Sequence, residues 1–172
     1  MKKILTKYGA LALAVALMVP LAHAQSAGIQ TAFGKDAGTL SDKFTGLAHV
    51  LVGKYDWKPG QGVRSVGDVF NLIVMENGML AGVLSGTPNT GAQPAPITDP
   101  GKLQEALKAS YANLQKAITG LSERDLQARV KLFGDDMTKQ DAVMLIILDQ
   151  HEHLGQSIAY ARTNGVVPPW SK

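Results

Sequence analysis

The sequence contains no cysteine, and this absence removes several kinds of protein chemistry. Without thiols there is no disulfide-stapled miniprotein, no c-type haem attachment, no thiolate zinc site and no cysteine nucleophile. There is also no cysteine to carry a lipid anchor. Any chemistry must therefore use His, Asp, Glu, Ser or Tyr side chains.

The sequence also has no net charge once the N-terminal segment is left out of the count. The 172 residues include 17 basic and 14 acidic ones, but Lys2, Lys3 and Lys7 precede Ala24. The remainder holds 14 of each sign, a formal net charge of zero. Attraction to phosphate backbones lacks its main support, so we expect no nucleic-acid partner. With 45% apolar and 18% charged residues, the composition is that of one ordinary globular domain.

The first 24 residues have the three parts of a secretory signal peptide. A basic start is followed by an apolar run from Gly9 to Leu21 and by a small-residue site at Ala22, His23 and Ala24. The run is shorter than the roughly 20 residues of a membrane-spanning helix, and no later stretch of that length lacks polar residues. We therefore expect cleavage after Ala24, no integral membrane segment, and a domain of residues 25–172 in the periplasm or the medium.

Residues 25–172 are predicted to form four amphipathic helices. Apolar residues at helical spacing indicate helices over about 36–52, 65–85, 100–118 and 138–163. Proline and glycine make residues 54–64 and 87–100 loops, residues 122–125 open a short turn, and residues 128–137 are extended or looped. With no convincing strand, the sequence predicts an all-α four-helix bundle.

The ends of these helices carry local signals. Ser65 followed by Asp68, and Thr138 followed by Asp141, have the spacing of capping boxes. Asp99 precedes a proline at the first position of its helix. The last helix is expected to end at residues 164–165, where an Asn-Gly pair easily adopts a left-handed conformation.

The predicted last helix carries a polar stripe on an otherwise apolar surface. At about 100° per residue, five residues fall within a sector of roughly 80°: Leu145, Asp149, His153, Gln156 and Tyr160. Asp149 and His153, at positions i and i+4, can share one metal ion, or they can form a buried hydrogen-bonded pair with the rest of the stripe. His151 points about 200° away from Asp149 and cannot share that ion.

The run from His151 to Gln156 and the segment from Tyr160 to Ser171 resemble the end of DinB-like proteins of the DinB/YfiT superfamily. Residues 57–59, residues 62–69 and Asn77 are similar to the loop and second-helix motif of that family. The resemblance implies an up-down-down-up four-helix bundle that is often dimeric. It also implies a divalent metal ion held by three histidines.

Only one of the three implied metal positions is a histidine here, namely His153. The second-helix position falls on Leu72, which cannot ligate, and the first position of the last-helix pair falls on Asp149, which can bind as a carboxylate. Glu76, one turn after Leu72, is a better substitute by spacing than His49, which is expected to face solvent. The candidate ligands are therefore Asp149, His153 and Glu76, and the candidate metals are Zn, Ni and Mn.

Two classes of function follow. The expected one is a secreted DinB-like bundle that is non-catalytic or weakly metal-binding, because two ligands on one helix would leave an isolated protein with little or no metal. The alternative is a divalent-metal-dependent hydrolase or transferase that uses a site around His153. A Ser-His-Asp hydrolase is not expected, because the sequence has no nucleophile-elbow motif. We also expect a homodimer, because the last helix is apolar beyond one stripe. The sequence does not identify a small-molecule ligand or substrate.

Overall fold

The computed structural model describes residues 19–87 and 94–171, with side chains from Gly28 onward. Its long helices are α2 (Val19–Val50), α3 (Val66–Ser85), α4 (Pro100–Thr119) and α6 (Lys139–Thr163). The short helix α5 (Glu123–Leu126) and the strands β1 (Arg129–Leu132) and β2 (Asp135–Thr138) lie between α4 and α6. Most of the predicted signal peptide, residues 1–24, lies outside the described residues.

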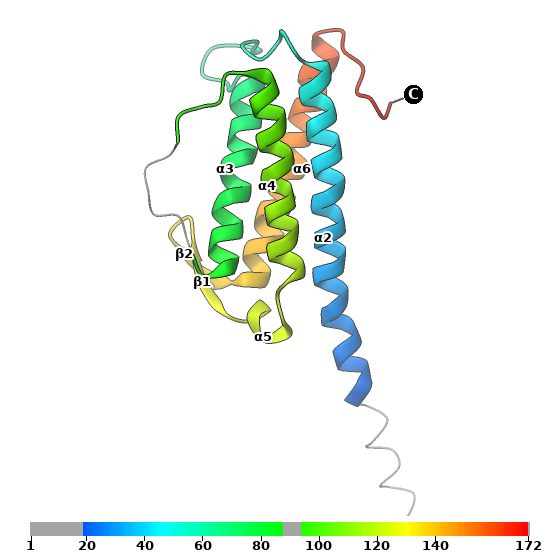
Figure 1. Ribbon diagram of the computed structural model, residues 1–172, viewed down its shortest axis with the longest axis vertical. Coiled ribbons are helices and arrows are strands. Elements are labelled where there is room, and N and C mark those ends of the chain that lie inside the picture. The colour runs from blue at the N-terminus through cyan, green and yellow to red at the C-terminus, as the bar shows by residue number, and fades with distance from the viewer. Residues whose placement is uncertain (1–18, 88–93, 172) are drawn as a thin grey trace, which may run out of the picture.

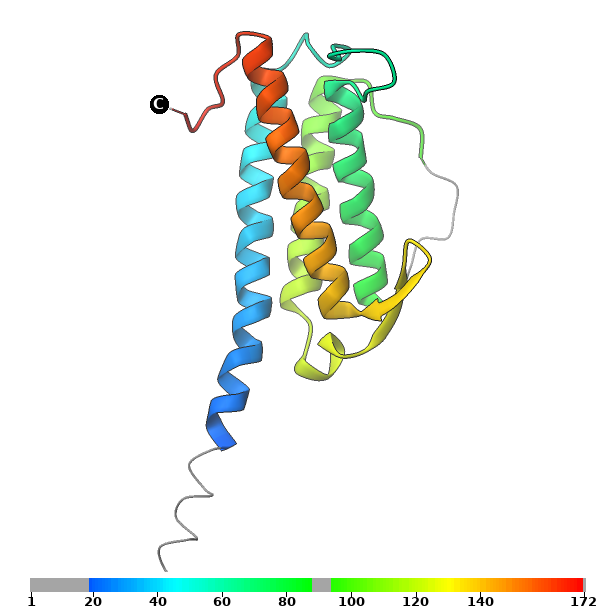
Figure 2. The ribbon, with the colours of Figure 1, turned by 180° about the vertical axis from the view of Figure 1, so that it is seen from behind.

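The four long helices form a bundle in up-down-down-up order (Figures 1 and 2). In Figure 1, α2 runs upward, α3 and α4 both run downward, and α6 runs upward. α2 contacts α4 and α6, and α3 contacts the same two helices. α3 and α4 are parallel neighbours, and residues 94–99, which precede α4, have no regular secondary structure. The predicted bundle and helix order are confirmed.

Local capping defines the helix starts, as the sequence predicts. At α3, Ser65 Oγ accepts from the Asp68 backbone N–H at 3.1 Å, and the Asp68 carboxylate accepts from the Ser65 N–H at 3.0 Å. The same reciprocal pair forms between Thr138 and Asp141 at α6, and Asp99 caps α4. Because these bonds satisfy the free N–H groups of a first helical turn, the starts can be read from short sequence segments.

The first helix is much longer than predicted, because α2 begins at Val19 instead of near Asp36. Gly34 in this stretch marks a close approach to α4, not a break in the helix. A Cβ atom added to Gly34 would lie 2.6 Å from Thr119 Cγ2, and the Gly34 carbonyl accepts from Gln115 Nε2 at 2.9 Å. At Gly34, tertiary packing thus overrides the low helix propensity of glycine. The start of α2 extends beyond the other helices (Figure 1).

Residues 129–138 form a hairpin that the sequence does not clearly signal. β1 and β2 are antiparallel, with Leu132 paired to Asp135 across the turn residues Phe133 and Gly134. These two have positive φ values of 53° and 94°, the backbone pattern of a type I′ turn. Asn or Gly normally stands where Phe133 does, so the usual hairpin signal is missing. The expectation of no strand is wrong for this small element, although the molecule remains mainly helical.

Aromatic rings from three helices meet in the bundle core. The ring of Phe44 in α2 stacks on Tyr111 in α4 at 6.1 Å between centroids, and it meets Phe70 in α3 edge-on at 6.4 Å. Of the helices in the described ranges, α3 is the one long and apolar enough to cross a membrane. A bundle core helix meets the same criterion, and α3 packs between α4 and α6.

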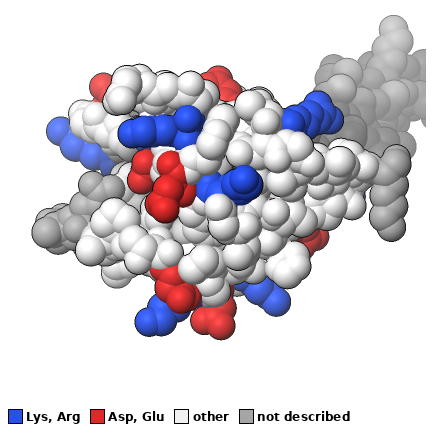
Figure 3. Space-filling view, turned by 90° about the horizontal axis from the view of Figure 1, so that it is seen from above, with Lys and Arg blue, Asp and Glu red and all other residues white. Residues whose placement is uncertain are grey.

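Charged side chains are mixed at the end of the bundle that carries the loop 51–65 and the C-terminal tail. Figure 3 views this end and shows acidic and basic groups close to one another among uncharged residues. Neither sign covers this face as a continuous field.

Candidate metal centre

One residue of α3 and two residues of α6 bring their ligating atoms together. Glu76, Asp149 and His153 each offer one oxygen or nitrogen atom, and these three atoms lie within 4.8 Å of one another. No other group of three or more His, Asp or Glu side chains within the described ranges meets this criterion. The three residues that the sequence suggests as ligands are therefore neighbours in the fold.

The cluster extends from the bundle interior to the surface. Glu76 is only 5% exposed, whereas the side chains of His153 and Asp149 are 15% and 40% exposed. A small ion can therefore approach from the Asp149 side without separation of the helices.

The environment of Glu76 disfavours a bare negative charge. Burial raises the pKa of its carboxyl from 4.5 to about 7, the negative charge of Asp149 and a hydrogen bond to it add to the rise, and Arg64 opposes it. Its Oε2 atom is buried and has no hydrogen-bond partner within the described part of the chain. A buried carboxylate oxygen of this kind is stabilised by a cation.

A chain of hydrogen bonds sets the orientation of the His153 ring. The Arg64 carbonyl can only accept, so the Tyr160 hydroxyl donates to it at 3.2 Å and itself accepts from Gln156 Nε2 at 2.8 Å. This arrangement turns Gln156 Oε1 toward His153 Nδ1, 3.0 Å away, and Nδ1 is the donor in that contact. In the neutral ring the lone pair is then on Nε2, on the side of Asp149, as in histidines that bind metals.

The loop that precedes α3 supports this chain of hydrogen bonds. The Trp57 ring packs edge-on against the Tyr160 ring, with 5.3 Å between centroids. The Trp57 carbonyl also accepts from the Val66 N–H at 3.0 Å, which holds the loop on the start of α3. The ring orientation of His153 thus depends on a loop far from it in sequence.

Asp149 and His153 do not form the buried pair that the alternative interpretation of the polar stripe requires. His153 Nε2 lies 3.5 Å from Asp149 Oδ2, which is long for a hydrogen bond, and Asp149 is substantially exposed. Of the stripe, His153, Gln156 and Tyr160 form the hydrogen-bonded chain, whereas Asp149 borders the pocket beside Glu76.

A pocket of about 300 Å³ opens over the cluster. Its polar side is formed by Arg64, Glu76, Asp149 and His153. Its apolar side is formed by Leu72, Phe133, Leu145 and Ile146. Leu72, at the position where the family resemblance implies a histidine, is thus part of the wall. Sequence reasoning missed Arg64 and Phe133 as pocket residues, because the first lies in a loop and the second at an unsignalled turn.

Buried amides lie directly behind the cluster. Asn77 and Gln150 follow Glu76 and Asp149 in the chain, and both are fully buried. Gln150 Nε2 donates to Asn77 Oδ1 at 2.6 Å, and Asn77 Nδ2 donates to Ser110 Oγ at 3.0 Å. These bonds connect α6, α3 and α4 at the level of the site.

The other described histidines lie outside the cluster. His49 is exposed, as predicted. His151 is also exposed, and its Nε2 lies 2.8 Å from Asp36 Oδ2 of α2. Neither can complete the ligand set around His153.

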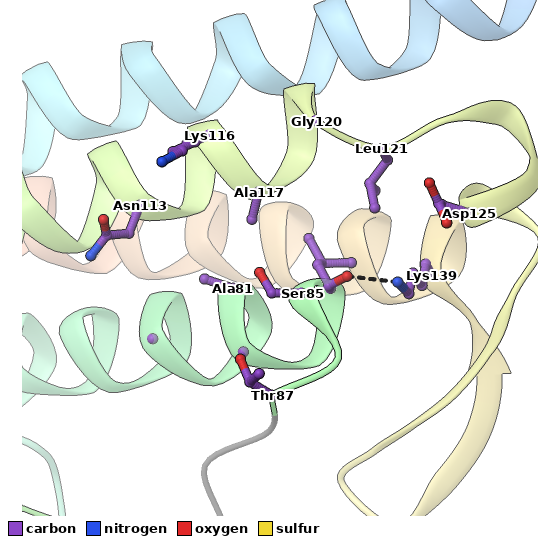
Figure 4. Close-up of a pocket in the computed structure, with 13 residues that line it drawn as sticks. Ala81, Ser85, Thr87, Asn113, Lys116, Ala117, Gly120, Leu121, Asp125 and Lys139 are labelled. Atoms are coloured by element: carbon purple, nitrogen blue, oxygen red, sulfur yellow. Dashed lines mark hydrogen bonds between the residues drawn. The ribbon is translucent and has the colours of Figure 1, made fainter.

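A larger cavity, of about 640 Å³, lies between the C-terminal halves of α3 and α4 (Figure 4). Small residues such as Ala81, Ala117 and Gly120 create the space. Lys139 at its edge donates from Nζ to the Leu84 carbonyl at 2.6 Å, the dashed line in Figure 4. Among the residues that the structure describes, no group of three or more potential metal ligands lines this cavity.

Comparisons with known proteins agree with this architecture. The DinB superfamily matches residues 45–157, which is more than half of the chain. No match is found among curated proteins.

Two solved structures show the same fold. A DinB-like protein from Bacillus subtilis is similar at 19% identity and a TM-score of 0.62, over 77% of this chain and 91% of that one. A DinB-like protein from Bacillus cereus is similar at 18% identity and a TM-score of 0.67, over 81% of this chain and 95% of that one. The bundle, its helix order and the family match together show that this chain belongs to the DinB superfamily.

Proposed function

We propose that this DinB-like domain binds one divalent transition-metal ion weakly, through Glu76, Asp149 and His153. The observation that carries the proposal is the convergence of one ligand atom from each residue within 4.8 Å. The hydrogen-bond chain from Arg64 supports it, because it leaves the Nε2 lone pair of His153 beside the two carboxylates.

The donor set fits such an ion. One imidazole nitrogen and two carboxylates suit Zn, Ni or Mn, and the buried Oε2 atom of Glu76 lacks any other described partner. Binding should be weak, because Glu76 must lose a proton held with a pKa of about 7 and Asp149 is partly exposed. An isolated protein would then carry less than one metal per chain and take up the rest on titration.

The test is a titration of untagged, chelator-treated protein with zinc, nickel or manganese salts. We expect saturation at one ion per chain, and an affinity lower by about 10-fold or more in His153→Ala and Glu76→Gln. His49→Ala and His151→Ala are matched controls, because these exposed histidines lie outside the cluster. The absence of saturable binding, or equal affinity in His153→Ala, would overturn the proposal and leave His153 as a packing residue.

A catalytic role is a second candidate, favoured by the pocket. Three protein ligands and an adjoining space of about 300 Å³ resemble catalytic sites, which keep a coordination position open, more than closed structural sites. A bound ion would supply Lewis acidity or a water of lowered pKa. The test is hydrolysis of an ester and amide panel with added metal. If the wild type shows no activity, or if activity persists in Asp149→Asn and His153→Ala, the catalytic role is wrong and the non-catalytic role remains.

We further propose that the domain acts outside the cytoplasm and as a homodimer. The predicted signal peptide supports the location. The exposed apolar residues Met144 and Leu148 of α6, 39% and 59% accessible, support a surface for a second copy.

A further inference from the structure

We propose that the pocket over the metal centre takes a small amphipathic anion, with its head group at Arg64 and its apolar body against Leu72, Leu145 and Phe133. This inference rests on the proposed metal site, and it specifies the class of ligand for which that site is shaped.

The apolar wall is exposed although it stands beside charged groups. Phe133 and Leu145 are 62% and 43% exposed, and both line the pocket with Leu72. Leaving such side chains in water forgoes the stabilisation that burial of apolar surface would bring. A ligand with an apolar body would cover them. The pocket volume of about 300 Å³ is at the lower limit for ligand sites, so the ligand is small.

The conformation of Phe133 points the same way. Its φ of 53° lies in the left-handed region, which is unfavourable for a bulky residue. The neighbouring Leu132 is 2% exposed and already anchors the hairpin to the core. Packing therefore does not account for an aromatic ring at the turn, whereas contact with a ligand in the pocket does.

Arg64 supplies the positive group. It lines the same pocket as Glu76, Asp149 and His153, so its charge lies beside the cluster. Its backbone is held by the Tyr160 hydroxyl, and the capped start of α3 follows immediately. With a divalent ion bound to ionised Glu76 and Asp149, the formal charges of the ion, the two carboxylates and Arg64 add to plus one. The loaded pocket therefore attracts an anion.

The experiment first measures zinc affinity and then titrates zinc-loaded protein with straight-chain carboxylates from acetate to octanoate. The matched alcohols and alkylamines are titrated in parallel. We expect the dissociation constant to fall about threefold to fourfold for each added methylene until the wall is covered. The alcohols should bind at least about 10-fold more weakly than the carboxylates, and the amines more weakly still.

Two variants distinguish recognition of the anionic head group from contact with the apolar wall of the pocket. Arg64→Gln should remove the preference for carboxylate over alcohol and keep the dependence on chain length, whereas Phe133→Gly should flatten that dependence. Lys58→Gln changes an exposed cation of the same loop outside the pocket. Val167→Ser changes an exposed apolar residue of the C-terminal tail that is also outside the pocket, so both variants should bind as wild type does.

The outcomes distinguish the two proposals. Failure of zinc to bind would overturn the metal centre and this inference together. Normal zinc affinity with no chain-length dependence, with equal binding of alcohols, or with unchanged binding in Arg64→Gln and Phe133→Gly, would overturn the amphipathic anion alone.

Discussion

The side-chain amide of Gln150 donates to Asn77 Oδ1 at 2.6 Å, and each residue directly follows one of the candidate metal ligands. Both amides are fully buried, so the bond is protected from water. It sets α3 and α6 in one register, and the same register brings Glu76 opposite Asp149.

Substitution of Asn77 by leucine should destabilise the fold and weaken metal binding. The change removes the bonds to Gln150 and Ser110 and leaves a buried amide unpaired, which costs about 1–3 kcal/mol. Adding Gln150→Leu should restore part of the stability, because both polar partners are then apolar. Chemical denaturation and zinc titration check this, with the exposed Glu152→Gln as control. Unchanged zinc affinity in both variants would separate the amide pair from the site.

The stability of metal-free protein should fall as pH rises from about 4.5 to about 7. The pKa of Glu76 is about 7 in the folded protein against 4.5 ordinarily, so the folded state holds the proton more tightly. The contribution of Glu76 to the free energy of unfolding is complete below pH 4.5. It is lost as the pH rises through the pKa of the folded state, and the loss amounts to about 3 kcal/mol. The measurement is the difference in unfolding free energy between wild type and Glu76→Gln, in which contributions of the capping carboxylates cancel. A difference independent of pH would contradict it.

Phe133→Gly should stabilise the protein by roughly 1 kcal/mol. Glycine adopts the positive φ of this turn position without strain, and the exposed phenyl ring contributes little core packing. A rise in thermal midpoint, compared with Leu132→Ala, which should lower it by removing a buried side chain, checks the turn. A loss of stability in Phe133→Gly would show that the ring packs usefully in the free protein.

The protein should be a dimer in solution, and Leu148→Arg should dissociate it. A charge placed on the exposed apolar face of α6 opposes burial against a second copy. Light scattering at tens of micromolar gives the mass, and Lys108→Glu, on exposed α4 surface, serves as the control. A wild-type monomer would remove the dimer from consideration.

Protein exported by a bacterial host should begin at Gln25. The small residues at positions 22 and 24 are those of a cleavage site, and Ala24→Leu should slow processing. Intact mass spectrometry distinguishes the two forms, and a secreted product that begins at Met1 would contradict the prediction.

Local signals in the sequence determined the starts of α3, α4 and α6, the end of α6 and the bundle itself. Capping pairs such as Ser65 with Asp68 act within one turn, and apolar periodicity reports which face of a helix is buried. The i, i+4 spacing likewise placed Asp149 and His153 on one face of the last helix. Glu76 was a candidate ligand because it lies one helical turn after Leu72.

Only the tertiary structure decided how these residues meet. Gly34 of α2 approaches Thr119 of α4 closely, and the hairpin depends on a left-handed Phe133 that no local preference predicts. The proximity of Glu76 to His153, the ring orientation set through Tyr160, and the pocket wall all join segments distant in the chain. Spacing along one helix specifies direction, whereas distances between helices follow from the packing of the whole core.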